Sequence, residues 1–153
     1  MIIISAMSND RIIGSGDGMP WEVPGEYQHF LDTTGGHTLI MGRRSYEIFA
    51  PTLTCRDCYV ITRGSGPFEK GIAVASLEAA IQQASRHNNK TFVAGGASIY
   101  AQAIAHAETM LLSYIQGDFQ GDAFFPKFDA ADWKVTFRED RGAYELVEYV
   151  RAT

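Results

Sequence analysis

Four short runs of apolar residues, most of them β-branched or aromatic, set the strongest limit on what this chain can fold into. The runs cover residues 2–4, 38–41, 59–61 and 91–94. Each is continuously apolar instead of alternating, which is typical of strands covered on both faces of a mostly parallel sheet. The runs therefore predict the central strands of such a sheet.

Helical patterns lie between these runs. The clearest begins behind Ser76, a suitable N-cap, and is expected to end at Asn88 and Asn89. Its apolar residues recur at helical spacing and are Leu77, Ala80, Ile81 and Ala84. A second, shorter stripe runs from Ile99 to Ile104. The alternation of strands and helices predicts an α/β fold.

The last part of the chain follows a different pattern. Residues 133–138 alternate between apolar and polar side chains, and residues 144–150 form another strand-like segment. Residues 140–143 between them have the composition of a tight turn, so the two segments predict an antiparallel hairpin.

The length of 153 residues, of which 46% are apolar, suits one domain with a substantial core. The sequence contains no repeat, low-complexity tract or linker. We therefore expect residues 1–153 to form a single-domain three-layer sandwich. Its mixed, mostly parallel central sheet would have about eight strands, with helices on both faces and a C-terminal antiparallel hairpin.

Charge and composition exclude several classes of function. A net charge of −5 argues against a nucleic-acid partner, and no apolar stretch approaches the roughly 18 residues of a membrane span. No basic region precedes the first apolar run, and two cysteines are too few for a disulfide scaffold. We expect a cytoplasmic monomer whose partners are small molecules, with no nucleic acid, membrane or metal.

Residues 14–21, which follow the first strand, form a glycine-rich segment ending in Pro20 and Trp21. The spacing of the glycines differs from that of the dinucleotide-binding fingerprint. The segment is either an ordinary flexible connector or a mobile lid over a binding site.

A helix is predicted to begin at Pro24, in the first-turn position that proline tolerates. Glu26 and Phe30 then share one side of this helix. Either Glu26 points into solvent, the interpretation that periodicity alone favours, or it lies in a pocket facing a polar ligand.

Three strand ends combine glycine with polar or cationic side chains. Gly95-Gly96 leads directly into a helix, Gly42 is followed by Arg43 and Arg44, and residues 62–66 include Arg63. Because ligands of α/β sheets bind at the carboxyl ends of strands, these segments predict an anionic ligand there. The alternative is ordinary solvated surface charge.

Cys55 and Cys58 have the C-x-x-C spacing of redox and zinc motifs. A zinc site needs two more ligands, and a thioredoxin-like dithiol should open a helix, whereas this pair leads into a predicted strand. We interpret the spacing as coincidence. The four histidines have no visible nucleophile partner, so a hydrolytic triad is not supported.

Taken together, these segments resemble the dihydrofolate reductase family over nearly the whole chain. The most specific match covers residues 13–30, with Pro20, Trp21, Pro24, Glu26 and Phe30. Weaker matches follow in the family's order. They are residues 41–45, Arg56, residues 95–100, and residues 121–126 with Gly121-Asp122 and Phe125-Pro126.

The resemblance implies NADPH-dependent reduction of 7,8-dihydrofolate to tetrahydrofolate, in which a hydride reaches C6 of the pterin and a proton reaches N5. By this match the catalytic residues are Glu26, Trp21 and Tyr100. The implied substrate-binding residues are Ile4, Ser5, Glu26, Tyr27, Phe30, Phe49, Leu53, Arg56 and Ser113. The implied cofactor-binding residues are Ala6, Ile13, Gly14, Gly18, Met19, Gly42, Arg43, Arg44, Ser45, Ile61, Thr62, Arg63, Gly95, Gly96, Ala97, Ser98, Ile99 and Tyr100.

The resemblance gives several of these residues a specific role. Glu26 would hydrogen-bond the 2-amino group and N3 of the pterin, which reverses the preference for a solvent-facing carboxylate. Trp21 and Ser113 would complete a hydrogen-bond network beside it. Arg56 would pair with the carboxylate of the substrate's glutamate.

The chain departs from the family pattern at four places. Tyr27 stands where an aliphatic residue is common, and His29 replaces another residue type on the same helix. Residues 51–55 lack the usual Leu-Pro step before Arg56, and the turn around Gly142 is short. These departures affect the expected geometry of the substrate's tail and of the lid.

Other functions stay open. The chain could reduce another pterin, such as a dihydromethanopterin, or a ribosylaminopyrimidine on the same fold. It could also be a non-catalytic pterin- or nucleotide-binding protein, or a dithiol redox protein that uses Cys55 and Cys58.

Overall fold

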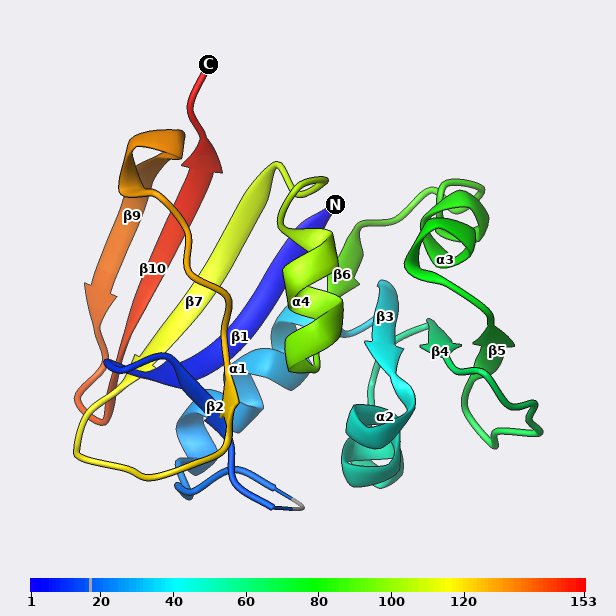
Figure 1. Cartoon of the computed structure of the whole chain (residues 1–153), viewed down its shortest axis with the longest axis horizontal. Helices are drawn as coiled ribbons and strands as arrows, with labels where there is room; N and C mark the ends of the chain where they lie inside the picture. Colours follow the sequence, from blue (N-terminus) through cyan, green and yellow to red (C-terminus); the bar gives the residue numbers. More distant parts are fainter. Residues whose placement is uncertain (17) are drawn as a thin grey trace.

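A mixed sheet of eight strands forms the middle layer of the structure (Figure 1). The structure is a computed structural model that describes residues 1–16 and 18–153. In their order across the sheet, the strands are β5 (Ile72–Val74), β4 (Asp57–Ile61), β3 (Thr38–Gly42), β6 (Thr91–Val93), β1 (Ile2–Ser8), β7 (Thr109–Ile115), β10 (Tyr144–Arg151) and β9 (Trp133–Asp140).

Helices cover the sheet, and a second, two-stranded sheet lies beside it. The helices are α1 (Pro24–Thr34), α2 (Arg43–Phe49), α3 (Leu77–Ala84) and α4 (Ala97–Ala103), with 3-10 turns η1 (Ala50–Thr52) and η2 (Ala130–Asp132). The small sheet pairs β2 (Ile12–Gly14) with β8 (Ala123–Phe124). In the part of the chain that the structure describes, no helix has the length and apolar character needed to cross a membrane.

The strand directions confirm the predicted α/β architecture. β1 runs parallel to both β6 and β7, and β3 runs parallel to β4 and β6. The antiparallel pairs of the eight-stranded sheet are at one edge, where β10 pairs with β7 on one side and with β9 on the other. The predicted C-terminal hairpin is therefore present, and both of its strands extend slightly beyond the predicted ends.

The central strands are buried on both faces, which explains their continuous apolar runs. Successive residues of β1 and β3 enter two separate clusters: Ile3 and Ile40 pack on one side of the sheet, Ile4 and Leu39 on the other. Figure 1 shows α3 and α4 in front of the sheet and α1 behind it. Side chains of α3 and α4 join the first cluster, and those of α1 and α2 join the second.

The predicted N-cap of α3 is confirmed, whereas its predicted end is wrong. The Ser76 hydroxyl accepts a hydrogen bond from the Ala79 backbone N–H at 3.1 Å. The helix ends at Ala84, several residues before Asn88, because Ser85 caps it: the Ser85 hydroxyl donates to the Gln82 carbonyl, and the chain leaves toward β6.

Four strands have no clear signal in the sequence. β5, β2 and β8 are only two or three residues long. β7 is longer, but it begins with Thr109 and Ser113 interrupts its apolar run. Their positions follow from pairing with distant strands: β7 lies between β1 and β10, and β2 pairs with β8 across more than 100 residues of sequence.

Replacing Ile40 with alanine tests the double burial of β3. Ile40 is 0% exposed, so Ile40→Ala should lower the free energy of unfolding by about 2 to 5 kcal/mol through lost burial and a residual cavity. Ile72 of β5 is 49% exposed, and Ile72→Ala should change the free energy of unfolding by less than about 0.5 kcal/mol. Urea unfolding measures both changes, and equal losses of unfolding free energy would contradict the burial of β3 on both faces.

Candidate active site

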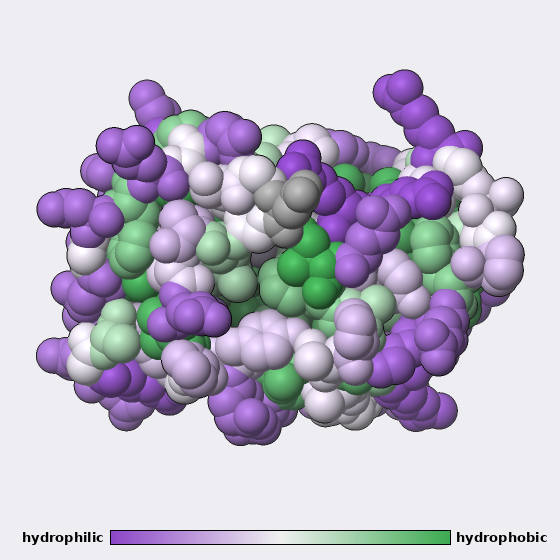
Figure 2. All heavy atoms as spheres, turned by 90° about the horizontal axis from the view of Figure 1, so that it is seen from below, coloured by the Kyte–Doolittle hydropathy of each residue, from purple (hydrophilic) through white to green (hydrophobic). Residues whose placement is uncertain are grey.

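A cavity of about 770 Å³ opens where β3, β4 and β6 end, beside the middle of β1. Figure 2, which views the molecule from below, shows a hollow near the middle of this face with apolar side chains around it. Parallel strands end at one edge of a sheet, so the segments that follow them meet there. This is the edge at which the sequence predicts a ligand.

Most of the predicted site residues line this cavity. Every residue assigned to the cofactor does so, from Ala6 on β1 to Tyr100 on α4. Among the residues assigned to the substrate, the lining includes Ile4, Ser5, Glu26, Tyr27, Phe30 and Phe49. Trp21, Leu53, Arg56 and Ser113 do not line it. Asp17, in the predicted glycine-rich segment, lies outside the described residues.

Glu26 is a buried carboxyl group facing the cavity. It lies in the first turn of α1, which begins at Pro24, and it is only 7% exposed. Burial raises the pKa of Glu26 to about 7, and a hydrogen bond with the Ser113 side chain on β7 opposes part of this rise. The solvent-facing alternative is therefore wrong, and the carboxyl group takes up or releases a proton near neutral pH.

Trp21 lies behind this part of the cavity. Its ring is buried beside Ile115, Tyr144 and Leu146, and it meets Phe119 edge-on at 5.3 Å between ring centroids. Its Nε1–H is buried and has no hydrogen-bond partner among residues 1–16 and 18–153. Trp21 therefore joins the end of the glycine-rich segment to the core below β7 and β10.

Tyr100 joins α4 to the central strand. Its hydroxyl donates a hydrogen bond to the Ile4 carbonyl at 2.7 Å, and its ring is buried. Burial raises the pKa of Tyr100 well above its ordinary value, and the nearby Glu26 adds to the rise while a hydrogen bond with Ser5 opposes it. The hydroxyl therefore stays protonated and serves as a donor.

The turn between β6 and α4 requires glycine. Gly95 has a φ of +109°, a conformation that L side chains rarely adopt, and a Cβ there would lie 3.3 Å from Ser45 Oγ. The Gly95 carbonyl accepts a hydrogen bond from the Gly42 N–H at 2.8 Å, which joins the ends of β6 and β3. This backbone forms a surface that a ligand can approach closely.

Three arginines lie at the same end of the cavity. Arg43 Nε lies 2.8 Å from Glu47 Oε1, and its guanidinium lies over the Phe68 ring at 5.6 Å. Arg44 donates to the Gly16 carbonyl, and Arg63 is exposed at the end of β4. This arrangement gives the glycine-lined end of the cavity a positive character that suits an anionic ligand.

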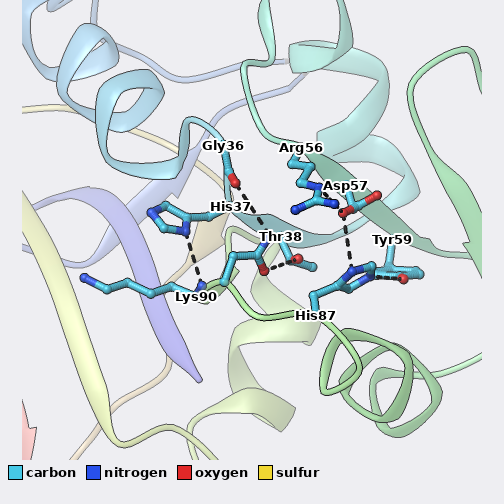
Figure 3. Close-up of polar contacts among 9 residues, drawn as sticks. Gly36, His37, Thr38, Arg56, Asp57, Tyr59, His87 and Lys90 are labelled. Carbon is cyan, nitrogen blue, oxygen red and sulfur yellow. Dashed lines mark hydrogen bonds and ion pairs between the residues drawn. The ribbon is translucent and has the colours of Figure 1, made fainter.

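Arg56 lies away from the cavity, at the amino end of β4 (Figure 3). Its side chain is 68% exposed, and its Nε is 3.8 Å from Asp57 Oδ2. The same oxygen is 3.6 Å from His87 Nδ1, and His87 Nε2 is 2.8 Å from the Tyr59 hydroxyl. Asp57, which His87 also contacts, is therefore the acidic neighbour of the exposed Arg56 guanidinium at this edge.

The structure also explains the other unusual residues of the sequence. His29 Nδ1 is 3.3 Å from Arg141 Nη1, so the hairpin turn contacts α1. Burial, and then the charge of Arg141, lower the pKa of His29 although Asp32 opposes the effect. Cys55 and Cys58 are free thiols that pack against the core cluster behind the cavity and do not line it.

Several lining residues are not among those that the sequence analysis assigns to the site. They are Gly16, Ile48, Ala75, Ser76, Leu77, Ala94, Gln102, Asp122 and Ala123. Asp122 and Ala123 reach the cavity because β8 pairs with β2, where the Asp122 N–H donates to the Gly14 carbonyl at 3.0 Å. Asp122 belongs to a segment that the sequence analysis singled out, but only pairing of distant segments brings it here.

Comparisons with known proteins agree with one another in the kind of protein that they match. A sequence model described as "Dihydrofolate reductase" matches residues 1–151. "Dihydrofolate reductase type A13" of Escherichia coli is 36% identical over 138 residues, covering 90% of this chain and 84% of that protein. "Dihydrofolate reductase HdrB" of Haloferax volcanii is 31% identical over 160 residues, covering 98% and 82%.

A solved structure has the same fold. It is a dihydrofolate reductase from Enterococcus faecalis complexed with NADP(H) and RAB-propyl, and it matches with a TM-score of 0.89. The match covers 99% of this chain and 96% of that chain at 24% sequence identity. This likeness establishes the fold.

The burial of Glu26 predicts how stability depends on pH. The folded pKa of about 7 exceeds the ordinary value of 4.5, so this group stabilises the fold below pH 4.5, and the contribution is lost as pH rises through 7. From pH 5 to 8, wild type should lose about 2 to 3 kcal/mol of unfolding free energy relative to Glu26→Gln.

Urea unfolding at several pH values measures this difference. The exposed Glu22 gives a matched control, because Glu22→Gln should leave the curve parallel to that of wild type. Parallel curves for wild type and Glu26→Gln would show that the Glu26 carboxyl group is not buried as described.

Proposed function

Since this chain belongs to the dihydrofolate reductase family, we propose that it reduces 7,8-dihydrofolate to tetrahydrofolate with NADPH in the cavity described above. Family membership rests on the sequence model that matches residues 1–151 and on relatives more than 30% identical over most of their length. The observation that carries the proposed reaction is the buried carboxyl group of Glu26, which titrates near pH 7 and faces the cavity.

Glu26 is proposed to orient the pterin and to favour its protonation. Its carboxyl group has the geometry to hydrogen-bond a 2-amino group and an adjacent ring nitrogen together. Ser113 holds the carboxyl group from β7. A pKa near 7 lets Glu26 exist in both protonation states at the working pH, as acid–base assistance to N5 requires.

The glycine-lined end of the cavity fits NADPH. A Cβ at Gly95 would crowd Ser45 and Tyr100, so the bare backbone leaves space there for a phosphate-bearing ligand. Arg43 and Arg63 would contact the phosphates. The similar structure from Enterococcus faecalis is a complex with NADP(H), which supports the assignment. When bound, NADPH supplies the hydride.

Apolar and aromatic residues would hold the pterin in position. Ile4, Phe30 and Phe49 line the substrate end and exclude water from the reacting rings. The hydrogen bond from Tyr100 to the Ile4 carbonyl fixes β1 against α4. All of these residues come from one chain.

We also propose that Arg56 pairs with the glutamate carboxylate of the substrate. Its side chain is exposed and its contact with Asp57 is long at 3.8 Å. An exposed ion pair of this kind contributes only about 0 to 1 kcal/mol, so the guanidinium is able to exchange partners.

One observation favours a second candidate, a reductase of a different dihydropterin. Arg56 lies outside the cavity, which would suit a substrate without a glutamate tail. Steady-state turnover of dihydrofolate and of dihydromethanopterin, each with saturating NADPH, separates the two candidates. Turnover of dihydromethanopterin alone would replace the proposed substrate.

Removing the Glu26 carboxyl group should abolish most activity. Glu26→Gln should lower kcat for dihydrofolate about 100-fold or more, because the amide cannot donate or accept a proton at working pH. Loss of NADPH absorbance measures the rate. Glu22→Gln, a matched exposed control, should keep wild-type activity. If the Glu26→Gln protein keeps the wild-type kcat, the proposed role of Glu26 in the mechanism is wrong.

Removing the Arg63 guanidinium should weaken the binding of NADPH more than the binding of NADH. Arg63→Ala should raise the Kd of NADPH about tenfold, the size expected for one lost charge-assisted hydrogen bond to phosphate, and that of NADH less than twofold. Arg86→Ala, on an exposed arginine outside the cavity, is the control. NADPH carries a 2′-phosphate on its adenosine that NADH lacks. Equal weakening of the binding of both cofactors would therefore show that Arg63 does not contact this 2′-phosphate.

A further inference from the structure

Tyr27 crosses the substrate end of the cavity from one wall to the other. It lies on α1 next to Glu26, and its ring stacks on Phe30 of the same helix at 6.0 Å between centroids and 24° between planes. It also stacks on Phe49 of α2, at 5.8 Å and 26°. Its hydroxyl reaches the Thr52 hydroxyl in η1. The side chain therefore bridges α1 and the opposite wall.

The direction of this hydroxyl contact follows from the other bond that Thr52 makes. Thr52 Oγ1 donates its single proton to the Phe49 carbonyl at 3.2 Å. It is therefore an acceptor toward Tyr27, and the Tyr27 hydroxyl is the donor. We refer to this hydrogen bond as the Tyr27–Thr52 latch.

The latch is not needed to hold the two walls together. The Thr54 hydroxyl donates to the Leu31 carbonyl at 2.7 Å, and the Gly36 N–H donates to the Thr54 carbonyl at 3.1 Å. These bonds join the segment after η1 to the end of α1 independently of Tyr27. Opening the latch therefore needs movement of the Tyr27 side chain and not separation of the walls.

With the latch closed, the three aromatic rings at the substrate end pack against one another. The rings of Phe30 and Phe49 are 6.2 Å apart between centroids, a distance at which two rings are already in contact. Tyr27 stacks on both of them. A substrate whose aryl arm packs on Phe30 and Phe49 therefore has to displace the Tyr27 ring from them, whereas a pterin with a small substituent does not.

We propose that Tyr27 is a specificity-determining residue that selects among dihydropterins by the arm they carry, with the Tyr27–Thr52 latch opposing the entry of an aryl group. This inference rests on the proposed function, in which Glu26 holds the pterin, and it adds that the arm packs against Phe30 and Phe49 at the substrate end. Opening an exposed hydrogen bond of this kind should cost roughly three- to tenfold in kcat/KM.

The test compares two substrates in variants that lack one hydroxyl each. The substrates are dihydrofolate, which has a benzoyl group, and 6-methyl-7,8-dihydropterin, which has none. The measured quantity is the ratio of kcat/KM for dihydrofolate to that for the methyl compound. Tyr27→Phe and Thr52→Val should each raise this ratio three- to tenfold, because each removes the latch and keeps the shape of the side chain.

A double variant and a control make the result specific. Tyr27→Phe combined with Thr52→Val should raise the ratio no further than either single change, because both remove the same bond. Thr54→Val removes a different hydroxyl bond between the same walls and should leave the ratio within twofold of wild type. If Tyr27→Phe fails to fold in a thermal melt, Thr52→Val carries the test alone, since Thr52 is exposed and does not line the cavity.

The outcomes separate this inference from the proposed function. A wild-type protein that turns over neither substrate contradicts the proposed function. A protein that turns over both, with a ratio unchanged or lowered in the single variants, contradicts the inference alone. Additive effects of the two changes, or an equal effect of Thr54→Val, would also overturn it.

Discussion

Burial of the central strands on both faces is the constraint on which the rest of this structure depends. Ile3 and Ile4 of β1 enter separate clusters on opposite sides of the sheet. Each fully buried side chain of this kind contributes about 1.5 to 3 kcal/mol, so a polar group at either position would be costly. Most functional groups therefore gather where the strands end, and the small hydroxyls of Ser5 and Ser113 are the exceptions within β1 and β7. Because β3, β4 and β6 are parallel, their ends share one edge and form one cavity.

Glu26 is the exception that gives this cavity its chemistry. Among the residues that the structure describes, it is the only carboxylate residue that is buried as a whole. One turn of α1 places it there, and the polar contact that opposes the effect of its burial comes from Ser113 on a distant strand. The protein thus bears the cost of a carboxyl group in apolar surroundings, and the resulting pKa near 7 makes this group able to exchange a proton with a ligand.

The sequence predicts best the parts of the structure that depend on local patterns. The four apolar runs, the Ser76 cap and the C-terminal hairpin could be identified because periodicity and turn composition act over a few residues. β7 and the β2–β8 pair could not, since each is defined by partners far along the chain. The same reason applies to the site. Periodicity alone favours an exposed Glu26, because its partner Ser113 comes from the distant strand β7. The exposed Arg56 does not line the cavity, and its place relative to a ligand cannot be predicted from a local pattern.

The C-terminal hairpin has a consequence for the order in which the protein is assembled during synthesis. Residues 133–151 follow every other element described here, yet β10 covers the open side of β7, the strand that carries Ser113. Tyr144 packs with Trp21, and Arg141 contacts His29 on α1. The strand that carries Ser113 therefore has an unpaired edge until the hairpin has left the ribosome. A nascent chain that ends before residue 133 exposes this edge and is at that stage prone to pair with other strands.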